Sequence, residues 1–263
     1  MAAPSIRVEL SPSVQYVLRL GDTALILGQR LSEWCGHAPV LEEDIALANI
    51  ALDLIGQARA LLTRAGQLEG QGHDEDQLAF LRDERDYRNA TIVELPNGAS
   101  RPGDFAFTVL RNAMMATWFR LLWERLREST DPELAAIAGK AVKEARYHQQ
   151  HSSDWVMRLG DGTEESARRL RVAVDELWRY GAELFDSDAV DAAAAANGLG
   201  PRWADLREPW LAEMRELFDE ARLAMPADTT FRSTGKSGVH SEHMGYILAD
   251  LQYLQRAYPG GAW

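Results

Sequence analysis

Apolar residues recur at the three- and four-residue spacing of α-helices along most of this chain, and no run of residues has a convincing strand pattern. Clusters of glycine and proline separate the periodic segments, so each segment is expected to form one helix. The pattern predicts helices near residues 14–35, 41–69, 75–89, 104–129, 131–159, 163–185, 203–223 and 239–257, with a short helix in the alanine-rich stretch 192–196.

The organisation expected from this pattern is a single all-α domain over residues 14–263. Its connections are short, as in a compact helical bundle. Residues 1–13 contain Pro4 and Pro12 and show no periodicity. They are therefore predicted to form a flexible tail.

Residues 45–58 form four helical turns that are apolar on nearly every side and contain one charge, Asp53. A helix that is hydrophobic all round is expected to be buried among other helices. A carboxylate in such a place must be paired, bound to a metal or protonated. Carboxylates inside a helical bundle are ligands of di-iron centres. The presence of Asp53 therefore raises the question of whether the sequence contains the other ligands of such a centre.

A di-iron centre in a bundle takes one Glu from each of two helices and a Glu-x-x-His from each of the other two. Gly56 stands three residues after Asp53, so the second helix lacks its histidine. Glu144 is followed at the same spacing by Tyr147, although His148 comes next.

The third long helix contains no Asp, Glu or His between residues 105 and 123, so it can supply no ligand. A complete six-ligand centre is therefore excluded for any ordinary bundle register, and no cofactor is expected in this chain. Five positions that match the ligand pattern only in part are interpreted as degenerate ligand positions: Asp53, Gly56, Glu144, Tyr147 and His148.

Two interpretations of the remaining polar residues stay open. Glu144, His148 and His151 fall along one helical stripe, and together with Asp53 they could form the metal site of an autonomous ferritin-like metalloenzyme. The structural interpretation, which is favoured, gives each residue an ordinary partner.

In that structural interpretation, Asp53 pairs with an arginine of a neighbouring helix, for which Arg111 is a candidate. Glu144 pairs along its own helix with Lys140 or His148. Buried pairs of this kind fix the register of helices and catalyse nothing.

The formal net charge of −12 argues against binding to nucleic acid or to an anionic membrane, because both need clustered Lys and Arg. No apolar segment is expected to reach the ~18 residues of a membrane span. Cys35 is the single cysteine, so an intrachain disulfide is impossible and a reducing, cytoplasmic location is predicted.

Residues 231–240 form a polar, basic loop with glycines before the last long helix. The Gly-Lys-Ser at 235–237 lacks the upstream glycine and the strand of a phosphate loop. A basic loop at a helix N-terminus can still bind an anion. Arg232, Lys236 and His240 are therefore candidates for contacting either the phosphates of a large acyl thioester or a partner chain.

Several stretches together resemble the non-catalytic C subunits of bacterial phenylacetyl-CoA 1,2-epoxidases, which are multicomponent monooxygenases. The resemblance spans residues 14–263. It is carried by the stretches Tyr16 to Asp22, Glu33 to Pro39, Asn49 to Arg59, Leu81 to Arg85, Lys143 to His148 and Gly238 to Arg256.

The resemblance implies a ferritin-like helical bundle with additional C-terminal helices that has lost its own metal centre. It implies a structural role beside a homologous catalytic subunit, which holds the di-iron site and epoxidises the ring of phenylacetyl-CoA with O₂ in aerobic phenylacetate breakdown. A reductase and small accessory subunits complete the implied complex, and this chain would be inactive alone. Contact with the CoA moiety is a further hypothesis, which rests on the loop at 231–240.

Overall fold

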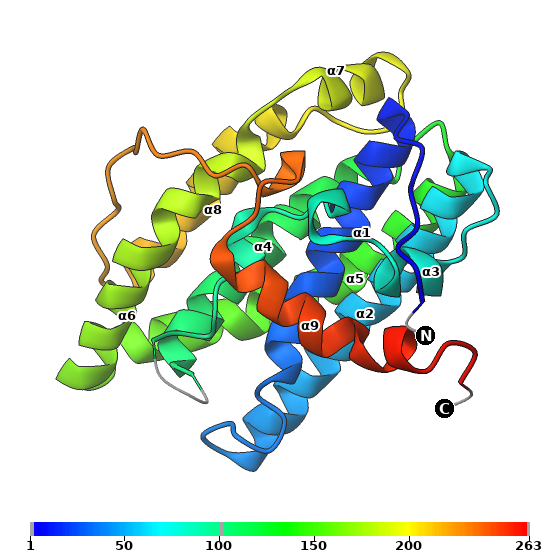
Figure 1. The fold of residues 1–263 in the computed structure, drawn as a ribbon. Helices are drawn as coiled ribbons and strands as arrows, with labels where there is room; N and C mark the ends of the chain where they lie inside the picture. Colours follow the sequence, from blue (N-terminus) through cyan, green and yellow to red (C-terminus); the bar gives the residue numbers. More distant parts are fainter. Residues whose placement is uncertain (1–2, 100–102, 262–263) are drawn as a thin grey trace.

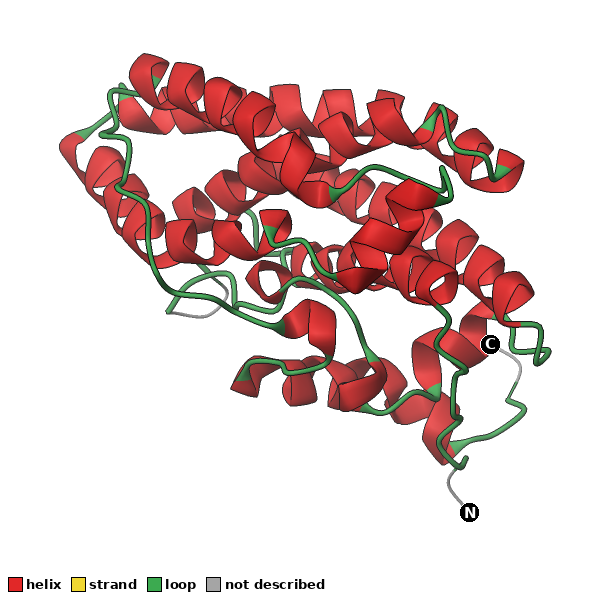
Figure 2. Ribbon diagram, turned by 90° about the horizontal axis from the view of Figure 1, so that it is seen from above, coloured by secondary structure: helices red, strands yellow, loops and turns green. Residues whose placement is uncertain are grey.

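The computed structural model describes residues 3–99 and 103–261, and in these ranges the chain is all-α (Figures 1 and 2). The only β feature in them is an isolated bridge between Thr234 and Val239. The α-helices are α1 (Pro12–Ser32), α2 (Leu41–Glu69), α3 (Glu75–Phe80), α4 (Phe105–Leu126), α5 (Pro132–Gly160), α6 (Glu164–Leu177), α7 (Ala189–Ala196), α8 (Arg207–Glu220) and α9 (Glu242–Ala257). Short 3₁₀ helices lie at Glu84–Asp86, Thr91–Val93, Trp178–Phe185, Trp203–Leu206 and Gly235–Ser237.

The bundle consists of two long helical hairpins, α1–α2 and α4–α5, which make the most extensive contacts in the fold. Helices α6 and α8 pack on α4, and α7 packs on α1. Helix α9 crosses the bundle and contacts α1 and α3 (Figure 1). This arrangement confirms the all-α, ferritin-like fold with additional C-terminal helices.

Capping residues in the sequence define the ends of the bundle helices. Ser11 accepts a hydrogen bond from the backbone of Val14 at the start of α1, and Asp131 caps α5 ahead of Pro132. Helix α2 ends at Glu69, and Gly70 after it has a φ of 75°, the left-handed conformation that glycine adopts readily.

The helix predicted at 75–89 is too long. Helix α3 ends at Phe80, and residues 87–90 are buried without regular helical structure. The physical reason is tertiary, because the backbone N–H of Arg88 donates to the Asp22 carboxylate at 2.8 Å rather than to a carbonyl of its own segment. The helix expected at 163–185 likewise changes to a 3₁₀ helix at Trp178.

The N-terminal segment before α1 contacts other elements. The backbone N–H of Ile6 donates to the carbonyl of Leu81 at 3.0 Å, and that of Ala3 donates to the carbonyl of Arg256 at 2.9 Å. Residues 1 and 2 of the predicted tail lie outside the described residues. The flexibility of the tail stays a prediction.

Helix α2 is not buried all round, so that expectation is wrong. One face packs in the core, whereas the opposite face exposes Leu41, Ile45 and Leu52, by 71 %, 54 % and 65 % respectively. Among the described residues α2 is the one helix long and apolar enough to pass a length-and-composition test for a membrane span, contrary to expectation, and 44 % of its most apolar window is buried. Core helices of soluble proteins share this length and composition.

A fully buried ion pair joins α1 to the segment after α3. Arg82 and Asp22 are both inaccessible to solvent, and Arg82 Nη1 donates to Asp22 Oδ2 at 3.0 Å. The guanidinium also lies 4.3 Å from the ring centroid of Tyr87. Isolated charges cannot remain in such a place, so the pair and its hydrogen bonds hold the segment to the bundle.

We predict that Arg82→Met lowers the free energy of unfolding by about 3–5 kcal/mol, because it leaves Asp22 buried without its ionic partner. Urea denaturation followed by circular dichroism measures the change. Arg59→Met is the matched control, since Arg59 pairs with Glu75 at an exposed position and its loss should change stability by at most about 1 kcal/mol. Equal effects of the two substitutions would contradict the prediction.

Candidate functional site

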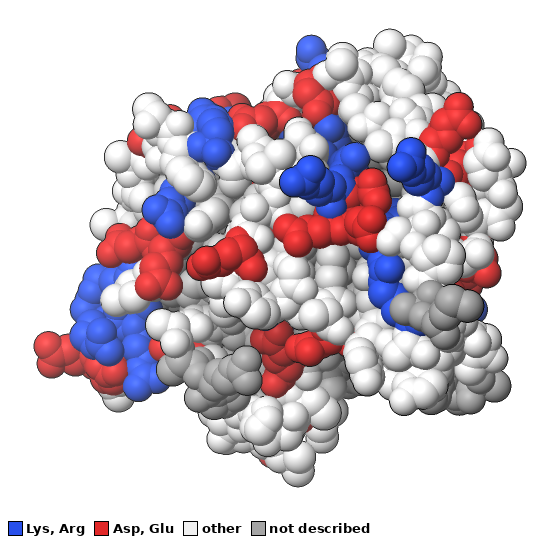
Figure 3. All heavy atoms as spheres, in the orientation of Figure 1, with Lys and Arg blue, Asp and Glu red and all other residues white. Residues whose placement is uncertain are grey.

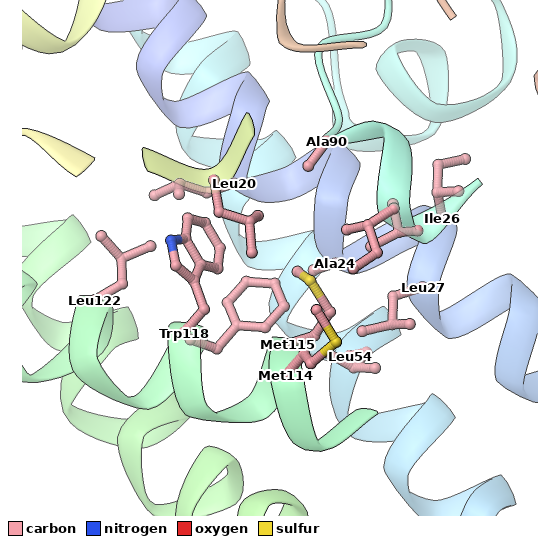
Figure 4. Packing of buried hydrophobic residues seen from close by; sticks show 14 of the residues in the cluster. Leu20, Ala24, Ile26, Leu27, Leu54, Ala90, Met114, Met115, Trp118 and Leu122 are labelled. Atoms are coloured by element: carbon pink, nitrogen blue, oxygen red, sulfur yellow. The ribbon is translucent and has the colours of Figure 1, made fainter. Parts of the chain in front are cut away.

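The centre of the bundle is apolar where α1, α2 and α4 meet. Figure 4 shows side chains from all three helices converging there, and all of them are buried. They include Leu20, Ala24 and Leu27 of α1, Leu54 of α2, and Met114, Met115 and Trp118 of α4. Asp22 is a fully buried carboxylate of α1, and it is paired with Arg82.

The sequence interpretation placed Asp53 and Gly56 in the bundle interior, and the structure corrects this. The Asp53 side chain is 40 % exposed, and Gly56 lies on the surface with open space where a Cβ would project. Tyr147 on α5 is exposed as well. These three positions therefore face outward from the bundle, and the missing histidine at 56 would have pointed to solvent.

Polar residues of α2 and α5 pair across the edge of the bundle. His148 Nε2 donates to Asp53 Oδ2 at 3.0 Å, and His151 Nε2 donates to Glu43 Oε2 at 2.9 Å. These pairs join the two helices at their boundary rather than at the bundle centre.

Glu144 accepts a hydrogen bond from Gln57 Nε2 at 2.9 Å and lies 3.4 Å from Lys140 Nζ. The predicted Glu144–Lys140 pair is thus confirmed. The predicted pairing of Asp53 with Arg111 is wrong. Arg111 is fully buried on α4 and donates instead to the carbonyl of Leu95 and to Asn97. Burial lowers the pKa of Arg111 to about 9, so it stays charged at neutral pH.

The donor set does not fit a metal centre. The four residues of the metalloenzyme alternative separate into the Asp53–His148 pair, His151 with Glu43, and Glu144 with Gln57. Over residues 3–99 and 103–261, no group of three or more His, Cys, Asp or Glu side chains is gathered closely enough to hold a metal ion.

Burial lowers the pKa of His148 below its usual value, and the hydrogen bond and charge of Asp53 offset this only in part. His148 is therefore mainly neutral at pH 7, and its Nε2–H donates to the carboxylate. A neutral donor paired with a half-exposed carboxylate suits a structural contact between helices.

The loop at 231–240 is built differently from the expected anion site. Lys236 is buried, its Nζ donates to the carbonyl of Asp186 at 2.6 Å, and the amine lies 4.5 Å from the ring centroid of Trp203. Burial lowers the pKa of Lys236. Arg232 is exposed and lies 3.4 Å from Asp186. Of the loop's two basic side chains, only Arg232 is thus accessible to a large ligand.

His240 pairs with the buried carboxylate of Glu94, and the sequence analysis did not predict this pair. Its Nδ1 lies 2.6 Å from Glu94 Oε1, and both side chains are inaccessible. Glu94 also accepts hydrogen bonds from Asn89 and from the backbone and hydroxyl of Ser241. An acid flanked by Ile92, Val93 and Leu95 is the one sequence signal that could have indicated this.

Charges on the surface are mixed. Figure 3 shows acidic and basic side chains interspersed over the face seen in Figure 1. On α6, Arg168 and Arg169 each pair with Glu165, at 2.7 Å and 2.8 Å. These arginines therefore form a solvated face with their acidic neighbour.

The fold and the site define an all-α, ferritin-like protein with an apolar bundle centre. The family model described as "Phenylacetic acid catabolic protein" matches residues 2–263, and the chain belongs to this family. It is 51 % identical over 248 residues to the C subunit of the 1,2-phenylacetyl-CoA epoxidase of Escherichia coli (strain K12), and the match covers 94 % of this chain and 98 % of the relative.

We predict a loss of stability at alkaline pH that depends on His240. Burial opposes protonation of this histidine, but the hydrogen bond and charge of Glu94 outweigh it and raise the pKa of His240 above the unfolded value of 6.5. The stabilisation is then fully present below pH 6.5 and is lost as the pH rises through the folded-state pKa.

The free energy of unfolding, measured from pH 6 to pH 9, should fall more steeply for wild type than for His240→Gln. The variant should also be about 1–3 kcal/mol less stable at pH 6, because Glu94 loses a charged donor. His37→Gln, at an exposed histidine, is the control and should keep the wild-type slope. Parallel curves for wild type and His240→Gln would refute the assignment.

Proposed function

We propose that this chain is a structural, non-catalytic subunit of a phenylacetyl-CoA epoxidase, in which it scaffolds a homologous catalytic subunit that holds the di-iron centre. One observation carries the proposal. Leu54, Met114 and Met115 pack together in the bundle, and over residues 3–99 and 103–261 no group of three or more His, Cys, Asp or Glu side chains is gathered as an oxygen-activating di-iron centre requires. A bundle with this interior can give a partner subunit a folded surface to bind. Its interior supplies no ligands for an oxygen-activating metal.

The proposed setting is aerobic phenylacetate breakdown in the cytoplasm. The relative's name gives the substrate class and identifies it as one subunit among several. In the proposed complex a reductase supplies electrons to the catalytic subunit, which epoxidises the aromatic ring with O₂, and small accessory subunits complete the assembly.

Contact between this chain and the CoA moiety is narrowed to Arg232. Arg232 is exposed, although it donates to the carbonyls of Thr229 and Phe231 and lies 3.4 Å from Asp186. Lys236 and His240 are instead bound to protein groups in the interior. An exposed arginine can bind phosphate through two parallel hydrogen bonds. Neutralising Arg232 should therefore affect the KM of the assembled enzyme more than its kcat if the contact forms.

The competing function is an autonomous ferritin-like metalloenzyme that uses Asp53, Glu144, His148 and His151. It requires these four side chains to converge on one ion. Their separation into different pairs along the α2–α5 boundary favours the structural subunit instead.

We predict that the chain purified alone from iron-replete cells contains far less than one iron per protein, counted by mass spectrometry. The complex with the catalytic subunit should contain iron and oxidise phenylacetyl-CoA. Double replacement of Glu144 and His148 by glutamine should leave the iron content of the complex unchanged, since neither is proposed as a ligand. One or two irons per isolated chain, lost in the double variant, would establish the metalloenzyme instead.

A further inference from the structure

A pocket lies between the 3₁₀ helix Trp178–Phe185, the start of α8 and the loop that follows α8. The loop is the orange segment beside α8 in Figure 1. The pocket has a volume of about 410 Å³, and sites for small molecules usually have ~300–1,000 Å³. Its lining residues are separate from the polar pairs at the α2–α5 boundary, so the function proposed above does not use this space.

Three aromatic rings form the inner wall of this pocket. Trp210 and Phe185 are buried, and Trp178 is half-buried. The ring centroids of Trp178 and Phe185 lie 5.3 Å and 5.2 Å from that of Trp210. Trp210 Nε1 donates to the carbonyl of Met114 at 2.9 Å, so the indole is held in place and its polar group needs no other partner. Rings arranged in this way offer flat apolar surfaces against which a further aromatic ring can stack or pack edge-on.

Small residues keep the space beside the rings open. Gly181 and Ala182 lie in the middle of the same 3₁₀ helix and line the pocket. Neither has a side chain beyond Cβ, so neither fills the space next to Trp178 and Phe185. A large side chain at position 182 is expected to occupy part of the pocket.

The charged side chains that line the pocket are arranged as two ion pairs. Arg207 Nη2 lies 2.9 Å from Asp228 Oδ1, and Arg232 Nε lies 3.4 Å from Asp186 Oδ1. Arg207 also lies 3.1 Å from Glu208. The two arginines and the two aspartates of the lining are each at least 40 % exposed, so they lie at the mouth of the pocket and not on its inner wall.

This balance of charge at the mouth indicates which ligands fit. An anion or a cation would have to displace one partner of an ion pair or lie beside a group of its own charge, and either costs free energy. An uncharged ligand requires neither. Its hydroxyl or amide group could accept a hydrogen bond from a guanidinium or donate one to a carboxylate, because both kinds of group line the mouth.

We propose that this pocket binds a small uncharged aromatic molecule that carries one hydroxyl or amide group. The aromatic ring lies against Trp178, Phe185 and Trp210, and the polar group lies at the mouth between the two ion pairs. This inference goes beyond the proposed function and does not depend on it.

The test is a titration of the full chain at pH 7, followed by NMR of the ligand, with molecules that share a benzyl group and differ in charge. 2-Phenylethanol is uncharged, phenylacetate is an anion, 2-phenylethylamine is a cation and phenylalanine is a zwitterion. We expect 2-phenylethanol to bind with a Kd of about 1 mM, a value reasonable for so small a ligand. The three charged molecules should bind at least about 5-fold more weakly, because their charges would have to be desolvated beside pairs that are already balanced.

The same titration can overturn the proposal. Absence of saturable binding of 2-phenylethanol would remove the site. Tighter binding of phenylacetate that Arg232→Gln abolishes would make this an anion site, and tighter binding of phenylethylamine that Asp186→Asn abolishes would make it a cation site. Tightest binding of phenylalanine would assign the pocket to zwitterions.

Variants that fill the pocket locate the ligand. Ala182→Phe should weaken the binding of 2-phenylethanol at least about 10-fold, because the new ring competes for the same space. Ala193→Phe makes the same change at a half-buried position on α7 and should bind like wild type. Thr229→Phe fills the pocket from the loop that follows α8 and serves as an independent variant if Ala182→Phe does not fold. Wild-type affinity in a filling variant that keeps the circular dichroism of wild type would place the ligand elsewhere and refute the proposal.

Discussion

Buried carboxylates must be supplied with hydrogen-bond donors, and this requirement organises the irregular parts of the molecule. Asp22, Glu94 and Glu183 are all inaccessible, and each binds donors from distant segments. Glu183 accepts from the backbone N–H groups of Thr91 and Lys236, so it joins two loops that are far apart in sequence. The helices alone would leave these loops without anchors.

The sequence predicted the helices well where local signals dominate, as at the start of α5, which Asp131 caps. Helix α1 was less well predicted, because it begins at Pro12, within the predicted tail, and ends at Ser32 rather than at residue 35. It failed where a distant residue decides the conformation. Nothing near Arg88 reveals that its backbone N–H belongs to Asp22, and nothing near Glu94 reveals that His240 is its partner. Periodicity also cannot tell which sides of an apolar helix are packed against the rest of the chain, which is why the burial expected for residues 45–58 was wrong.

The sequence predicted which metal ligands are missing from the candidate site, but it did not predict where the remaining polar side chains lie. The missing ligands on α4 could be read directly, because a segment without Asp, Glu or His leaves no alternative. Asp53 was placed in the interior because residues 45–58 are apolar on nearly every side, yet it lies at the α2–α5 boundary. The bundle centre includes the methionines Met114 and Met115, whose flexible side chains pack irregular spaces well. The Asp53–His148 pair lies at the edge of the bundle.

The backbone N–H of Ala3 donates to the carbonyl of Arg256. This hydrogen bond holds segments near the two ends of the described chain side by side. A short covalent link between these ends would strain the folded state little. It would remove much of the conformational freedom of the unfolded chain, because the closed loop would contain almost every residue. Of all the places in this fold where a cross-link could be introduced, this one therefore restricts the unfolded ensemble over the longest stretch of chain.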